Sequence, residues 1–104
     1  MKEEHDIDSI LEKSLRDTLE EIGGTSVRDS VIYYLREKYQ IKLDRMSSNP
    51  SALVKALIEI FGVGESLIEK KILEKFLSLF SLKDESGKLE DIIKRAKISA
   101  EAEI

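Results

Sequence analysis

The chain has 104 residues and a formal net charge of −4, with 37% charged and 41% hydrophobic residues. This length fits one domain, is too short for two, and can bury one core without disulfides or a metal. The absence of cysteine excludes a disulfide framework, a thiolate zinc site and a cysteine nucleophile. The acidic charge balance argues against a general attraction to nucleic acid, although a local basic face could still bind it.

The N-terminal residues 1–6 are acidic and lack the apolar stretch of a signal peptide. No apolar run approaches the roughly 20 residues that span a bilayer. We therefore expect a soluble, cytoplasmic protein without membrane contact. The abundance of Lys, Glu and Ile is typical of heat-adapted proteins, so a thermophilic origin is a further expectation.

Two helices are predicted in the first 40 residues. Apolar residues at spacings of three and four predict the first helix from about residue 6 or 8 to 22, and Gly23 and Gly24 end it. Ser26 and Asp29 form the pattern of a capping box, which predicts a new helix to about residue 40.

The second helix carries the three tyrosines of the chain. Helical spacing places Tyr34 on its inner face, in the predicted core, and Tyr33 off that face, where it is a candidate contact residue. The remaining inner positions are Val27, Val31, Leu35 and Tyr39.

A connection without a long period follows and ends at Asn49 and Pro50, which fit the N-cap and first position of a third helix. We expect Leu43 and Met46 to anchor this connection to the core. The third helix ends at the Gly-Val-Gly corner of residues 62–64. Its inner face is predicted to hold Leu53, Leu57, Ile60 and Phe61.

The fourth helix, from residue 65 to about 80 or 82, has the widest apolar face. At helical spacing its apolar residues cover about 220°, well beyond the roughly 100° of an ordinary surface helix. This width indicates either the central helix of the fold or half of a subunit interface. The residues of this arc are Ile68, Ile72, Leu73, Phe76, Leu77, Leu79, Phe80 and Leu82.

After a polar break at residues 83–87, a fifth helix is predicted with one apolar face: Leu89, Ile92, Ile93, Ala96 and Ala100. No strand pattern occurs in the sequence. The expected fold is therefore an all-α, compact five-helix bundle, a single domain over residues 1–104 without a sheet. Residues 1–6 and 99–104 are expected to be frayed.

The candidate chemical sites are weak. Residues 62–66 lack the motif and preceding strand of a phosphate-binding loop. His5, Asp6 and Asp8 could offer metal ligands but lack the spacing of a known site. Adjacent acids such as Glu20 and Glu21 point about 100° apart on a helix, which is poor geometry for acid–base catalysis. We predict no catalytic residue, no metal site and no cofactor.

Glu69 lies inside the apolar arc of the fourth helix, either as an exposed first-turn acid or as a polar contact at an interface. It completes the candidate interface set, which is Glu69, Ile72, Leu73, Phe76, Leu77 and Phe80. The candidate nucleic-acid contacts on the same helix are Lys70, Lys71 and Lys75. Acids interspersed among these lysines favour ordinary surface pairs instead.

Residues 22–80 resemble a family of small archaeal helical domains described as a Nitrosopumilus output domain. The features that carry this resemblance are the capped, tyrosine-bearing helix from Ser26 to Tyr39, the Asn49-Pro50 helix start, and the stretch from Ala56 to Glu69 with its Phe-Gly-Val-Gly corner. The resemblance implies a helical domain that occurs alone or attached to signalling modules, with an output or interaction role. It implies no catalytic residues.

Three functions follow as hypotheses. The first is a non-catalytic protein-interaction or signal-output module that forms a homodimer through the fourth helix, with the fifth helix as a possible further part of the contact. The second is a transcription-associated protein that binds DNA through the helix pair joined at residues 62–64. The third is a carrier of a small apolar ligand, or an enzyme, because helical bundles can enclose apolar pockets.

Overall fold

A computed structural model describes residues 7–80 and 88–102 of the chain. Within these ranges the fold is all-helical and contains no strand. The elements in chain order are α1 (Ile7–Glu37), the short 3-10 helix η2 (Leu43–Ser48), α2 (Pro50–Phe61), the 3-10 turn η3 (Gly62–Gly64), α3 (Glu65–Phe80) and α4 (Leu89–Ala102).

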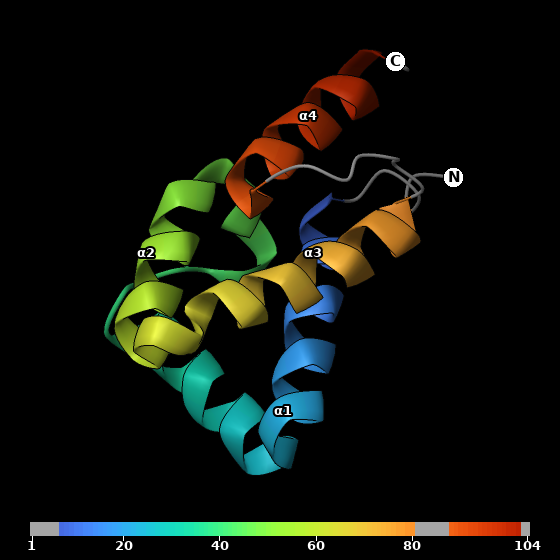
Figure 1. The fold of residues 1–104 in the computed structure, drawn as a ribbon. Helices are drawn as coiled ribbons and strands as arrows, with labels where there is room; N and C mark the ends of the chain where they lie inside the picture. Colours follow the sequence, from blue (N-terminus) through green and yellow to red (C-terminus); the bar gives the residue numbers. More distant parts are fainter. Residues whose placement is uncertain (1–6, 81–87, 103–104) are drawn as a thin grey trace.

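Residues 7–80 and 88–102 form four α-helices, so the prediction of five was wrong. The two helices expected on either side of Gly23 and Gly24 form the single bent helix α1. Only Gly24 leaves the helical conformation, with φ of 80° and ψ of −173°, while the residues around it remain helical. Figure 1 shows the result as a sharp reversal of direction at the cyan end of the first limb.

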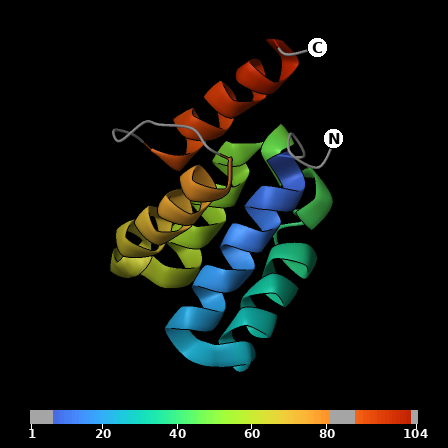
Figure 2. The ribbon, with the colours of Figure 1, turned by 90° about the vertical axis from the view of Figure 1, so that its right-hand side faces the viewer.

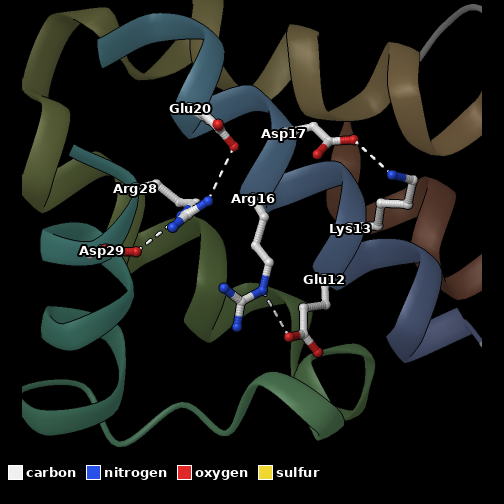
Figure 3. A network of polar contacts seen from close by, with 7 residues as sticks. All are labelled: Glu12, Lys13, Arg16, Asp17, Glu20, Arg28 and Asp29. Carbon is white, nitrogen blue, oxygen red and sulfur yellow. Dashed lines mark hydrogen bonds and ion pairs between the residues drawn. The ribbon is translucent and has the colours of Figure 1, made fainter. Parts of the chain in front are cut away.

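An arginine bridges the two limbs of α1 across this bend. Arg28 Nη1 donates to Oε1 of Glu20 on the first limb at 3.2 Å, and Arg28 Nε donates to Oδ1 of Asp29 at 2.9 Å (Figure 3). The Asp29 carboxylate and that of Glu20 raise the pKa of the Arg28 guanidinium above its ordinary value. The bend is therefore held by a charged contact as well as allowed by glycine.

The core is built around the first limb of α1 and α3, which cross each other in Figure 1, and the second limb, η2, α2 and α4 add buried residues to it. Small polar side chains of α1, Ser14 and Thr18, are fully buried there. Ser14 Oγ donates to the carbonyl of Ile10 at 2.8 Å, so its polarity is satisfied inside the helix. The large side chains with almost no exposed surface are Leu11, Leu15, Leu19, Leu35, Met46, Leu53, Leu57, Ile72, Phe76, Leu89, Ile92 and Ile93.

The connection between α1 and α2 is anchored as predicted. Met46 is buried and Leu43 packs half-buried against the core. Asn49 caps α2, because its Oδ1 accepts a hydrogen bond from the N–H of Ala52 at 3.2 Å and Pro50 occupies the first turn. The predicted start of α2 is therefore confirmed.

The last helix, α4, packs against α2, α3, α1 and η2 and lies at the end of the fold away from the bend of α1 (Figure 2). Its predicted apolar face is confirmed for Leu89, Ile92, Ile93 and Ala96, all of which are buried. Helical backbone extends to Ala102, which includes residues 99–102 of the segment expected to fray. The rest of the expected frayed ends, residues 1–6 and 103–104, lies outside the described residues.

The dimensions fit one compact unit. The radius of gyration is 13.0 Å, the value of about 13 Å expected for one domain of roughly 100 residues. Among the described helices, none combines the length and the apolar character needed to cross a bilayer.

Candidate functional site

The wide apolar arc of α3 is covered largely by the chain's own helices. Ile72 and Phe76 have no exposed surface and Leu73 is 9% exposed. Leu77 is half-buried and packs against the same core, while the side chain of Phe80 lies outside the described part of the structure. Most of the candidate interface on α3 therefore faces α1, α2 and α4 of the same chain.

Glu69 makes its polar contact within the chain. Its Oε2 accepts a hydrogen bond from the backbone N–H of Leu89 at 2.8 Å. Leu89 is the first residue of α4, and the first N–H groups of a helix have no partner inside that helix. The Glu69 carboxylate satisfies one of these donors and lies at the positive end of the α4 dipole. Glu69 thus joins α3 to α4.

The structure adds Glu65, which the sequence analysis did not select as a site residue. Glu65 is the first residue of α3 and is only 7% exposed. Burial is the main reason that the pKa of Glu65 is raised to about 7. A hydrogen bond with the Glu69 carboxyl group and the negative charge of that group raise this pKa further, whereas the positive charge of Lys88 lowers it. The Gly-Glu helix start was visible in the sequence, but the burial depends on packing that local spacing does not encode.

The candidate nucleic-acid contacts do not act as a group of three free cations. Lys75 Nζ lies 3.2 Å from Oε1 of Glu21 at the end of the first limb of α1. Lys70 is exposed and Lys71 is half-buried on the same helix. One of the three lysines is therefore already paired with an acid of the same chain.

Three large apolar side chains are exposed where α2 turns into α3. Ile58 in the last turn of α2 is 49% exposed, Val63 in η3 is fully exposed, and Leu67 in the first turn of α3 is 58% exposed. We call these three residues the corner surface. Figure 1 shows this turn at the edge of the molecule, distant from α4. The sequence signal for it is that all three fall outside the predicted inner faces of their helices.

The tyrosines differ from the prediction in one respect. Tyr34 is 51% exposed, so its predicted core position was wrong, and Ile32 occupies the core with Val31 and Leu35 instead. Tyr33 is exposed as expected, and its ring lies 6.4 Å from that of Tyr34, edge to face. The rest of the predicted inner face holds, because Val31 and Leu35 are buried and Val27 and Tyr39 pack against the core.

Tyr39 has a defined partner. Its hydroxyl donates to Oε1 of Glu59 at 2.6 Å, which links the segment after α1 to α2. This hydrogen bond is the main reason that the pKa of Tyr39 is raised, followed by partial desolvation. Tyr39 therefore contributes to packing between elements.

One hollow in the described surface has a volume of about 700 Å³ and is open to solvent. Six of the eight residues that line it are charged or polar, and Ile41 and Leu43 are the apolar members. The other residues that line it are Glu12, Arg36, Glu37, Gln40, Lys42 and Asp44. Such a lining lacks the apolar enclosure that a carrier of apolar ligands needs.

Two of the candidate metal ligands, His5 and Asp6, lie outside the described residues. The third, Asp8, has another role, because its Oδ1 accepts a hydrogen bond from the N–H of Ser47 at 2.7 Å. Within residues 7–80 and 88–102, no group of three or more His, Asp or Glu side chains is arranged to hold a metal ion.

Comparisons with known proteins add no relative. No family model, no curated protein and no solved structure matches the chain.

Proposed function

We propose that this chain is a non-catalytic interaction module that binds a second copy of itself through the corner surface. The observation that carries the proposal is the exposure of Ile58, Val63 and Leu67 at one turn of the fold. Single exposed apolar residues are common on monomers, whereas a group on one feature is typical of an interaction site.

The corner surface is held in place by a hydrogen bond of the turn and by buried neighbours on its inner side. The turn begins at Gly62, whose φ of 60° favours glycine, and its N–H donates to the carbonyl of Ile58. Leu57 at the end of α2 and Ile68 at the start of α3 are buried in the core on the other side. A preorganised surface loses less conformational entropy on binding than a flexible one.

A second copy is the proposed partner because the three side chains are apolar and uncharged. Such a patch is complementary to itself and can form a symmetric contact in which the same residues meet from both subunits. The dimer contact is thereby assigned to the corner rather than to Ile72, Leu73 and Phe76, which the chain's own helices cover.

The proposed role in signalling rests on the resemblance of residues 22–80 to the output-domain family. A dimerising helical module is a suitable output element, because self-association can bring together whatever each copy is attached to. This role needs no catalytic group. The proposed role depends only on the corner surface, where the exposed apolar residues lie.

Light scattering after gel filtration tests the proposal. The wild-type chain of 11.8 kDa is expected to elute with about twice that mass at high concentration. Val63→Asp is expected to give a monomer that remains folded, because Val63 is fully exposed. Ile22→Glu is the matched control, since Ile22 is 42% exposed at the bend of α1, and it should remain dimeric.

A wild-type monomer at high concentration, or a dimer unaffected by Val63→Asp, would contradict the proposal. Binding of duplex DNA at low salt, lost on Lys70→Glu and Lys71→Glu but kept in Val63→Asp, would support the nucleic-acid hypothesis instead. Low salt is the condition where contacts with phosphates are strongest.

A further inference from the structure

Two glutamates one turn apart at the start of α3 meet the first turn of α4. Glu65 is almost completely buried, at 7% exposure, and Glu69 is half-buried. Oε2 of Glu69 accepts the hydrogen bond from the N–H of Leu89 at 2.8 Å. The side chain of Leu89 itself is fully buried in the core. The first residue of α4 is thus hydrogen-bonded to Glu69, and Glu69 in turn interacts with the buried Glu65.

When Glu65 and Glu69 are both ionised, one buried oxygen of Glu65 lacks a hydrogen bond. Oε2 of Glu65 is buried and has no hydrogen-bond partner among the described residues. Two carboxylates are both acceptors, so neither can donate to the other. A single proton on Glu65 supplies the missing donor and forms a hydrogen bond to Glu69, whose remaining negative charge still faces the N-terminus of α4.

We propose that Glu65 and Glu69 form a pH-sensitive contact that fixes the first turn of α4 when they share a proton and weakens its attachment when both are ionised. The contact is a property of the single chain. It is independent of the proposed self-association through the corner surface.

The charged groups that act on Glu65 come from two elements. Glu69, on its own helix, opposes ionisation, and Lys88, directly before α4, favours it. Glu90, the next acid on α4, is engaged elsewhere, since Ser51 Oγ of α2 donates to it at 3.0 Å and Lys94 Nζ lies 3.6 Å from it. Burial is the largest influence on Glu65.

The direction of the pH effect follows from the raised pKa. Burial and Glu69 raise the pKa of Glu65 from an ordinary 4.5 to about 7 in the folded chain. Glu65 therefore binds a proton more tightly when α4 is attached than when the first turn of α4 has opened and Glu65 is exposed to water. Its stabilising contribution is complete below about pH 4.5, declines as the pH rises, and is lost above about pH 7.

Two NMR measurements on the full chain test the inference. The side-chain carboxyl carbon of Glu65 should titrate near pH 7 rather than near 4.5. The local opening constant of the Leu89 amide, from hydrogen exchange corrected for intrinsic rates, should rise on the order of a hundredfold between pH 4.5 and pH 8. Both measurements are repeated on Val63→Asp, so that self-association does not affect the outcome.

Matched variants separate this contact from general titration. Glu65→Gln keeps the shape and provides a donor that does not titrate, so the Leu89 amide should stay protected at pH 8. Glu74→Gln removes the same charge from an exposed position of α3 and should leave the wild-type pH response unchanged. Titration of Glu65 near 4.5, or the same pH response in Glu65→Gln as in wild type, would overturn the inference. If Glu65→Gln does not fold, the wild-type titration alone decides.

Discussion

Oδ1 of Asp8 accepts a hydrogen bond from the backbone N–H of Ser47 over 2.7 Å, which joins the first turn of α1 to η2. Asp8 is half-buried and Ser47 is buried, so water replaces this contact poorly. The contact fixes the connection between α1 and α2 at a separation of 39 residues. It therefore stabilises the arrangement of the elements rather than one helix.

Asp8→Ala should consequently lower the free energy of unfolding by about 1 to 3 kcal/mol, the range for a partly buried hydrogen bond to a charged group. The matched control is Asp17→Ala, which removes an exposed i,i+4 pair with Lys13 on the same limb. Its cost should be below about 0.5 kcal/mol. Urea denaturation measures both. Equal losses of unfolding free energy in the two variants would show that the Asp8 hydrogen bond contributes no more than an exposed ion pair.

The bend in α1 should depend on Gly24. Its φ of 80° and ψ of −173° lie in a region that is nearly restricted to glycine, so Gly24→Ala should cost about 1 to 3 kcal/mol. At Gly64 a Cβ would meet no atom within 4 Å. Gly64→Ala should therefore be neutral or stabilising by up to about 1 kcal/mol, because it restricts the unfolded chain. Thermal denaturation of both variants checks this contrast.

The coverage of α3 by its own chain predicts which of its apolar residues carry stability. Phe76 has no exposed surface, so Phe76→Ala should cost about 3 to 5 kcal/mol through lost burial and a cavity. Leu79 is 45% exposed, and Leu79→Ala should change stability by no more than about 0.5 kcal/mol. If Phe76 instead faced a partner, its replacement would alter the molar mass while leaving the monomer stable.

The hydroxyl of Tyr39 should titrate above the ordinary pKa of 10.0, mainly because it donates to the Glu59 carboxylate. The neutral phenol is favoured by folding, so its contribution to stability is present below pH 10 and declines as the pH rises through the raised pKa. Glu59→Gln should return the pKa of Tyr39 toward its ordinary value. Ultraviolet absorbance of the phenolate, in a background with Tyr33 and Tyr34 replaced by Phe, measures the shift.

The local features of the fold were predictable because they depend on nearby residues. The Asn49-Pro50 start of α2 follows from capping chemistry within one turn. The buried face of α4 follows from helical spacing, which Leu89 and Ile93 obey. In each case the residues that carry the signal are also the residues that form the structure.

The remaining features depend on contacts between distant segments. Spacing along α3 identified its wide apolar face but could not identify what covers it, because α1 and α4 are remote in sequence. Helical spacing placed both Tyr34 and Leu35 on the inner face of the second limb, but in the packed fold Ile32 is buried and Tyr34 is exposed. The burial of Glu65 likewise requires the packing of the completed fold, where its carboxyl meets Glu69 and Lys88.

The self-association proposed for the corner surface is tested most directly by backbone NMR spectra recorded over a wide range of protein concentration. The amide signals of Val63 and Leu67 should move progressively as the concentration rises, while that of Ile22, at the bend of α1, stays constant. The same signals should stay constant in Val63→Asp. The proposed function would be contradicted if the amide signals of Val63 and Leu67 did not change with concentration and the measured molar mass stayed at 11.8 kDa.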